Sequence, residues 1–295
     1  MDGEAEGGGL TGPLSAAERA RSVECAAAER RLEARRIGGG PYLLALRRDE
    51  HCWGEGFPFA LPVLTGVDDI RLDAPVTLLA GDNGTGKSTL VEAIAEAMGF
   101  SAEGGELERS GERPARPRPV LDGALVPLLS QVKPRGGYFL RAESFFNVAR
   151  FVDGGSTFAP DLSLYGDVPL HQQSHGQSFL ALAANRFGPE GLYILDEPEA
   201  ALSFSGALAL LAIVARASRA GAQFIIATHS PVLLACPGAR IYELDERGAS
   251  ACLYDDLDVV RLTRGFLDDP GRYLRAALGP SEDAAGPVGE ADGSE

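Results

Sequence analysis

A run of eight residues with three glycines, a lysine and a serine constrains this chain more than any other feature of its sequence. The residues before it, 76–80, form a short apolar run that predicts a strand buried on both faces. The residues from 87 to 98 repeat apolar side chains at helical spacing, which predicts a helix. The run fits the pattern G-x-x-x-x-G-K-[ST] and reads Gly81, Asp82, Asn83, Gly84, Thr85, Gly86, Lys87 and Ser88.

This run, the phosphate loop, is suited to bind the phosphates of a nucleotide. Its glycines let the backbone curl so that N–H groups point inward at phosphate oxygens. The following helix adds the positive end of its dipole. Lys87 is placed to reach the β- and γ-phosphates, and the Ser88 hydroxyl is placed to bind Mg²⁺. We predict that ATP contacts the whole loop and the next residue, Thr89.

Two acidic residues follow a second apolar strand, predicted at 192–195. If this strand ends beside the phosphate loop, Asp196 is placed to bind Mg²⁺. Glu197 is then placed to orient or deprotonate an attacking water. An isolated acidic pair is as often a solvated turn, but the phosphate loop upstream favours the functional interpretation.

A third apolar strand, predicted at 224–227, ends in Thr228-His229-Ser230. A histidine at the tip of a strand next to the acidic pair can hydrogen-bond the γ-phosphate or the attacking water. We predict that His229 distinguishes ATP from ADP in this way. Together with Lys87 and Glu197, it completes the predicted catalytic set.

The remaining pattern alternates strands with helices, which favours an α/β fold with a largely parallel sheet. We expect one compact domain over residues 37–279, with a helical or irregular lobe at about 101–177. We expect a flexible or helical extension at 1–36 and a disordered acidic tail at 280–295. Further strands are predicted at 42–46, 69–72, 137–141, 241–244 and 251–254, and helices at 14–36, 143–150, 179–187, 205–220, 259–267 and 272–278.

The formal net charge of −15, from 42 acidic and 27 basic residues, argues against a broad nucleic-acid-binding surface. Both termini contribute to this acidity, because residues 1–12 and 280–295 contain acidic side chains and no basic ones. Within the lobe, residues 109–118 hold four arginines, and three glutamates, Glu106, Glu108 and Glu112, lie just before or among them. This stretch is either a local patch for DNA or a solvated segment, and the glutamates favour the latter.

Composition also bears on the compartment. Four scattered cysteines form no Cys-x-x-Cys pair, which is typical of reduced thiols. The longest apolar run, residues 207–215, is shorter than the roughly twenty residues that a membrane helix requires. The N-terminal residues have no apolar core typical of a signal peptide. We therefore expect a cytoplasmic protein with no membrane span.

Several segments resemble one known superfamily. Residues 195–203, Leu-Asp-Glu-Pro-Glu-Ala-Ala-Leu-Ser, resemble the Walker B motif and D-loop of ABC-type ATPases. Residues 228–230 resemble their switch-histidine loop, and Ser-His-Gly-Gln-Ser at 174–178 is similar to their LSGGQ signature. Residues 137–146, 227–231 and 262–267 look like those of small stand-alone AAA/ABC-like ATPases that share features with SMC-type and DNA-repair ATPases.

This resemblance covers residues 41–279 and implies a P-loop NTPase fold. The expected form is an ABC-type head with a mostly parallel core sheet, an antiparallel N-terminal part and a helical signature subdomain. The resemblance also implies ATP hydrolysis to ADP and phosphate in a head-to-tail homodimer that sandwiches two ATP molecules. Ser174, Gly176 and Gln177 of one subunit would then contact the γ-phosphate held by the other.

Some positions depart from the superfamily pattern. His175 replaces the first glycine of the signature, and Ser203 stands where the D-loop usually has aspartate. Gln131 is a weak candidate for the Q-loop, and Glu143 is better placed to approach Mg²⁺ or water. Glu143 is therefore predicted as a third metal ligand, although a carboxylate at a helix start would look the same. Tyr42 and Phe57 are the candidates for stacking on adenine.

Two alternatives to a dimeric ATP hydrolase remain. The first is a nucleotide-gated switch that acts on DNA or on a partner protein, with incidental ATP turnover. The second is the ATP-binding subunit of an ABC transporter, which the altered signature makes less favoured. The motifs do not distinguish among these uses of ATP, because they specify the nucleotide chemistry alone.

Overall fold

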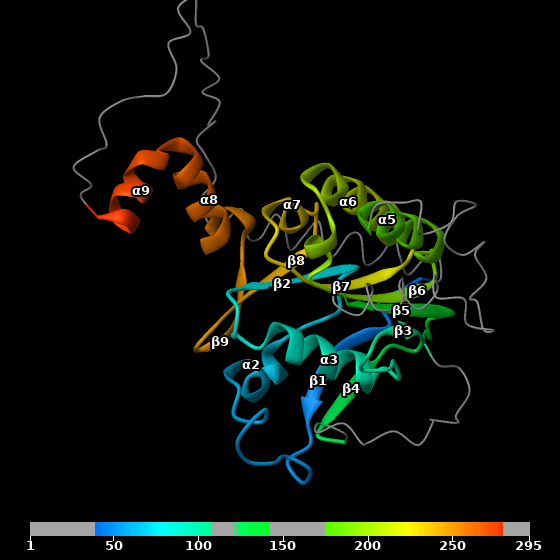
Figure 1. The fold of residues 1–295 in the computed structure, drawn as a ribbon. Coiled ribbons are helices and arrows are strands. Elements are labelled where there is room, and N and C mark those ends of the chain that lie inside the picture. Colours follow the sequence, from blue (N-terminus) through cyan, green and yellow to red (C-terminus); the bar gives the residue numbers. More distant parts are fainter. Residues whose placement is uncertain (1–38, 108–120, 122, 142–174, 280–295) are drawn as a thin grey trace, which may run out of the picture.

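A seven-stranded sheet forms the centre of the protein (Figure 1). The computed structural model describes residues 39–107, 121, 123–141 and 175–279. The five middle strands run parallel, and the two edge strands pair antiparallel, which confirms the predicted mostly parallel core sheet. In spatial order the strands are β3 (Gly105–Glu106), β5 (Gly136–Arg141), β6 (Gly191–Asp196), β7 (Gln223–Ala227), β2 (Val76–Gly81), β8 (Arg240–Asp245) and β9 (Gly248–Cys252).

Helices cover both faces of this sheet (Figure 1). One face packs against α5 (His175–Arg186), α6 (Phe204–Arg219) and α7 (Pro231–Leu234). The other packs against α2 (Pro62–Thr65), α3 (Lys87–Ala97) and a two-stranded antiparallel sheet of β1 (Leu43–Arg48) and β4 (Leu125–Leu129).

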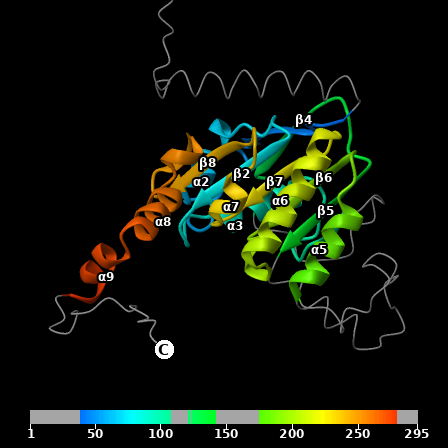
Figure 2. The same cartoon turned by 90° about the horizontal axis from the view of Figure 1, so that it is seen from above.

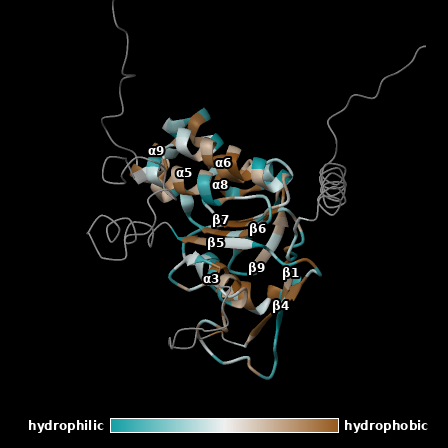
Figure 3. Ribbon diagram, turned by 90° about the vertical axis from the view of Figure 1, so that its right-hand side faces the viewer, coloured by the Kyte–Doolittle hydropathy of each residue, from teal (hydrophilic) through white to brown (hydrophobic). Residues whose placement is uncertain are grey.

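Alternation of side chains along the strands supplies a hydrophobic core to each layer. In β7, Phe224 and Ile226 pack toward α5 and α6, whereas Ile225 and Ala227 pack toward α3. Figure 3 shows apolar residues, in brown, along the strands between the two layers. A strand that is apolar at every position therefore lies where both faces are covered, as the sequence predicts.

The C-terminal helices α8 (Asp258–Asp268) and α9 (Pro270–Leu278) extend away from the sheet (Figure 2). They follow the short 3₁₀ turn η5 (Tyr254–Asp256). Their boundaries agree with the two predicted helices. No helix in the described part of the chain is long and apolar enough to cross a membrane.

The strand predicted at 69–72 is wrong. A 3₁₀ turn, η1 (Val67–Asp69), occupies its start, and only an isolated bridge between Ala45 and Arg71 follows. The Asp68 carboxylate accepts hydrogen bonds from the Arg48 backbone and guanidinium, which holds this turn against β1 instead of extending it. The short elements α2, α7, β3 and β4 are not among the predicted ones, and the helices predicted at 14–36 and 143–150 lie outside the described residues.

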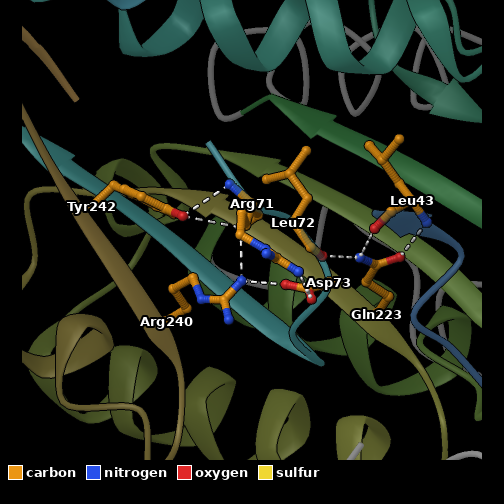
Figure 4. A network of polar contacts seen from close by, with 7 residues as sticks. All are labelled: Leu43, Arg71, Leu72, Asp73, Gln223, Arg240 and Tyr242. Atoms are coloured by element: carbon orange, nitrogen blue, oxygen red, sulfur yellow. Dashed lines mark hydrogen bonds and ion pairs between the residues drawn. The ribbon is translucent and has the colours of Figure 1, made fainter. Parts of the chain in front are cut away.

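A buried glutamine joins the two sheets ahead of the phosphate loop (Figure 4). Gln223, at the start of β7, is fully buried. Its Oε1 accepts hydrogen bonds from the backbone N–H groups of Tyr42 and Leu43, at 2.7 and 2.9 Å. Its Nε2 donates to the carbonyl oxygens of Leu43 and Leu72, at 2.8 and 2.6 Å. These bonds tie β1 and the segment that leads into β2 to the central sheet.

Candidate functional site

The phosphate loop lies between β2 and α3, as predicted. Gly86 precedes α3 with φ at 90°, in the left-handed region that glycine enters without steric cost. Lys87 opens the helix, with Ser88 and Thr89 in its first turn. The structure therefore has the order of elements that the motif requires, which is a buried strand, a glycine-rich turn and a helix.

The Lys87 side chain lies inside the curl of the loop. Its Nζ donates hydrogen bonds to the carbonyl oxygens of Gly81 and Asp82, each at 2.8 Å. Burial lowers the pKa of the lysine, and the nearby charges of Glu197 and Asp196 oppose that shift. The ammonium is thus held where phosphate oxygens would approach the loop.

Ser88 and Asp196 meet beside the loop. The Ser88 hydroxyl donates to Oδ1 of Asp196 at 3.1 Å, although the two residues come from α3 and β6. Burial raises the pKa of Asp196 to about 6, while Arg141 and the Ser88 hydrogen bond oppose the rise. A hydroxyl and a carboxylate are the hard oxygen donors that Mg²⁺ prefers. The described residues contain no cluster of three or more His, Cys, Asp or Glu suited to a metal ion.

Glu197 and His229 form a pair at the ends of β6 and β7. His229 Nε2 lies 3.0 Å from Oε1 of Glu197. Glu197 has φ at 48°, and it is the one non-glycine residue in the described part of the chain with a positive φ. Its backbone N–H donates to the Ala227 carbonyl at 3.0 Å, which holds this uncommon conformation at the strand end. The predicted catalytic residues Lys87, Glu197 and His229 therefore converge on one edge of the sheet.

Two further polar residues contact this site and were not predicted. Arg141 ends β5 opposite Asp196, with Nε 3.8 Å from Oδ2 of Asp196 and Nη2 2.7 Å from Oε1 of Glu92. Glu199 follows in the 3₁₀ turn η4 (Pro198–Ala201), and its Oε1 accepts hydrogen bonds from the backbone N–H groups of His229 and Ser230. In the sequence, Arg141 stands at the end of a predicted strand, and Glu199 lies within residues 195–203, which resemble a Walker B motif and D-loop.

The described part of the predicted signature packs against η4. Gly176 lies in the first turn of α5, where a Cβ would stand 2.9 Å from the Ala201 carbonyl oxygen. Glycine therefore permits a close approach at this position. Gly176 and Gln177 line a pocket of 480 Å³ together with Ala201, Leu202, Ser203 and the start of α6. Ser174 and Glu143 lie outside the described residues.

The three weaker candidates differ in their exposure. Gln131 is exposed after β4, and Phe57 is 80% exposed in the segment before α2. Tyr42 is 1% exposed, and its hydroxyl donates to the Gly221 carbonyl at 3.2 Å. Adenine stacking by Tyr42 is therefore wrong, because its ring is enclosed in the core.

Comparison with known families gives two partial matches. Residues 149–235 match a family described as "AAA domain, putative AbiEii toxin, Type IV TA system". Residues 64–116 match a family described as "AAA domain". The first match spans the Walker B and histidine segments, and the second spans the phosphate loop.

Curated relatives match more than half of the chain. The chain is 30% identical over 203 residues to the cytochrome c biogenesis ATP-binding export protein CcmA of Rhodospirillum rubrum, covering 66% of this chain and 81% of that protein. It is 29% identical over 178 residues to the CcmA of Salmonella typhi, covering 58% of this chain and 84% of that protein.

Solved structures are also similar. A putative metal-chelate type ABC transporter in an inward-facing conformation matches with 19% identity and a TM-score of 0.37, covering 63% of this chain and 74% of that chain. The SMC head domain from Thermotoga maritima matches with 16% identity and a TM-score of 0.34, covering 62% of this chain and 91% of that chain.

Proposed function

This chain belongs to the family of ABC-type ATPases, and we propose that it hydrolyses ATP within a head-to-tail dimer that holds two ATP molecules between its subunits. The proposal rests on one observation above all. The two residues that open α3 meet the residues at the ends of β6 and β7 at one edge of the sheet; these are Lys87, Ser88, Asp196, Glu197 and His229. This arrangement supplies a phosphate cradle, oxygen ligands and a carboxylate base in one place.

ATP binding requires no net positive charge on the molecule. The backbone N–H groups of the phosphate loop and the Lys87 ammonium would contact the β- and γ-phosphates. Ser88 and Asp196 would hold Mg²⁺, which neutralises charge on those phosphates when bound. The formal net charge of −15 therefore does not oppose nucleotide binding, because the site acts locally.

Hydrolysis would use the carboxylate of Glu197. As a water oxygen forms its bond to the γ-phosphorus, Glu197 accepts a proton from that water. The bond between the γ-phosphorus and the bridging oxygen breaks, and its electron pair stays with ADP. Lys87 stabilises the charge on the transferring group. His229, hydrogen-bonded to Glu197, would orient the carboxylate and contact the γ-phosphate.

The dimer would complete the site from the other side. In this arrangement Gly176 and Gln177 at the start of α5, with Ser174 before them, would contact the γ-phosphate held by the partner subunit. Support comes from the position of α5, whose first turn packs on η4 directly after Glu197. Gly176, Gln177 and Ser203 line one pocket, which supports a shared surface for the proposed signature and D-loop.

A second candidate is the ATP-binding subunit of a transporter. The relatives named ATP-binding export proteins favour it, and this role is compatible with the same ATPase chemistry. In that case a separate membrane protein would be the partner, and the ATPase would act from the cytoplasm. A DNA-gated or protein-gated switch remains the other alternative, and its predicted arginine-rich segment at 109–118 lies outside the described residues.

The central test compares Glu197→Gln with Lys87→Ala. Glu197→Gln keeps the shape of the side chain but loses the base, so ATP should bind while turnover falls on the order of a hundredfold or more. The trapped ATP should shift the protein to a dimer on size-exclusion chromatography with Mg²⁺. Lys87→Ala should lose ATP binding and show no such shift.

The outcomes separate the parts of this proposal. Normal turnover by Glu197→Gln would exclude Glu197 as the base. An ATP-bound Glu197→Gln that stays monomeric would contradict the sandwich dimer. Wild-type turnover measured with added DNA at low salt then tests the switch alternative, because DNA stimulation is expected only there. Co-purification with a membrane protein would favour the transporter subunit.

A further inference from the structure

Glu199 links Glu197 to His229, although it is neither of these two paired residues. It lies in η4, two residues after Glu197. One of its carboxylate oxygens, Oε1, accepts the backbone N–H groups of both His229 and Ser230, the latter at 3.1 Å. These two N–H groups follow β7, where the chain leaves the sheet. The carboxylate therefore provides an acceptor for both groups. The Ser230 N–H also donates to the Thr228 hydroxyl oxygen, at 3.0 Å.

In the described part of the chain, the second carboxylate oxygen of Glu199 has no hydrogen bond that could replace the two made by Oε1. Oε2 of Glu199 is buried and has no hydrogen-bond partner among the described residues. Within that part of the chain, no arginine, lysine or histidine side chain forms an ion pair with Glu199 either. The bonds from residues 229 and 230 are thus the hydrogen bonds that the structure gives the carboxylate of half-buried Glu199. Charge-assisted hydrogen bonds of this kind are stronger than neutral ones.

These contacts link Glu197, Glu199 and His229 in a ring. From Glu197 the chain passes through η4 to Glu199, whose side chain holds the His229 backbone. The His229 ring then returns to Glu197, with Nε2 3.0 Å from Oε1. The 3₁₀ turn is closed by a hydrogen bond from the Ala200 N–H to the Glu197 carbonyl, at 3.1 Å. One short segment therefore sets the position of the carboxylate and of the histidine.

We propose that Glu199 is a positioning residue for ATP hydrolysis, which holds the His229 backbone so that the imidazole stays on the Glu197 carboxylate. This inference rests on the proposed function, because it assigns Glu199 an effect through His229. Glu199 acts on the backbone of the loop and not on ATP. Its loss should therefore slow the chemical step while the phosphate loop, built from β2 and α3, still binds nucleotide.

The experiment compares Glu199→Ala, Glu199→Gln, His229→Ala and the double variant Glu199→Ala/His229→Ala. In Glu199→Ala the turnover number should fall on the order of a hundredfold, the loss expected when a catalytic group is misplaced by about an ångström. The KM for ATP and the affinity for a non-hydrolysable analogue should change less than about threefold. Glu199→Gln keeps an oxygen acceptor for both N–H groups and should recover most of the activity.

The double variant provides the decisive comparison. If Glu199 acts through His229, the double variant should be no slower than His229→Ala alone. A double variant slower by the full factor of Glu199→Ala would overturn the inference, as would normal turnover in Glu199→Ala. If instead His229→Ala itself turns over normally, the role proposed for His229 fails first, and the positioning role falls with it.

A matched control comes from β8, which pairs with β2 on the side opposite β7. Glu243 also accepts a backbone N–H group with its side chain, from Asp258 at the start of α8, at 2.8 Å. Glu243→Ala removes the same type of contact, but from the start of α8 and not from the loop that carries His229. It should leave the turnover number within about twofold of the wild type, which separates positioning from a general loss of stability. Turnover reduced equally in Glu243→Ala and Glu199→Ala would overturn the inference.

Discussion

Burial disfavours the charged form of the Asp196 carboxylate. It is 6% exposed, and burial raises its pKa from 3.8 to about 6 despite the nearby Arg141 and Ser88. Between these pH values the folded protein holds a proton that the unfolded chain has lost. The stability of the nucleotide-free protein should therefore fall as pH rises from about 4 to 6, and the cost should persist above pH 6.

Asp196→Asn should consequently stabilise the nucleotide-free protein at pH 8. The gain is at most about 3 kcal/mol, because one pKa unit corresponds to about 1.4 kcal/mol. Urea unfolding without nucleotide should show this gain shrinking as the pH approaches 4. Asp245→Asn is the control, because Arg247 lowers the pKa of exposed Asp245 and no gain is expected there. A destabilised Asp196→Asn at pH 8 would contradict the assignment of burial as the dominant cause.

The sequence predicts the site residues that come directly after an apolar strand. Asp196, Glu197 and His229 come directly after such runs, and parallel strands bring their ends to one edge. Arg141 and Glu199 escape this reasoning. The contact of Arg141 with Asp196 depends on the register between β5 and β6, and that of Glu199 depends on a 3₁₀ turn. Neither register nor turn type is encoded in the spacing of apolar residues.

Among the helices, α6 shows how a motif position can have a structural role. Ser203, which stands where the D-loop usually has aspartate, is the N-cap of α6, and its Oγ accepts the Gly206 N–H at 3.2 Å. Ser203→Ala should lower the free energy of unfolding by about 1 kcal/mol. Ser203→Asp should preserve it, since aspartate caps equally well.

Chemical denaturation of these variants checks the prediction. Ser218 lies near the end of α6 and its hydroxyl donates to the Ala215 carbonyl at 3.2 Å, so it caps no N–H group. Ser218→Ala is therefore the control, with an expected change below about 0.5 kcal/mol. An equal loss in Ser203→Ala and Ser218→Ala would show that capping by Ser203 contributes nothing specific.

Long elements were predictable, and short ones were not. The strands β2, β6 and β7 and the helices α3 and α6 carry enough periodic apolar residues to be identified from the sequence. By contrast, α2 and α7 have four residues each, and β4 contains Pro127 with exposed Val126 and Leu128. Such elements take their form from tertiary partners, β4 from its pairing with β1.

For the molecule as a whole, one buried side chain joins the two sheets. Gln223 satisfies four backbone groups, two at Leu43 and one each at Tyr42 and Leu72. Figure 4 shows its contacts with Leu43 and Leu72. No periodic pattern in the sequence marks a single buried glutamine as the link between layers. Its effect reaches the site, because the Leu72 segment leads into β2 and β2 ends in the phosphate loop.

Gln223→Ala should therefore destabilise the whole fold by about 3 kcal/mol or more, because it leaves buried N–H and carbonyl groups without partners. The loss should appear in one cooperative unfolding transition, since β1 and the central sheet share this contact. Gln131→Ala, at an exposed glutamine, should change the stability by less than about 0.5 kcal/mol. A Gln223→Ala protein as stable as Gln131→Ala would mean that the two sheets are held together by their hydrophobic contacts alone.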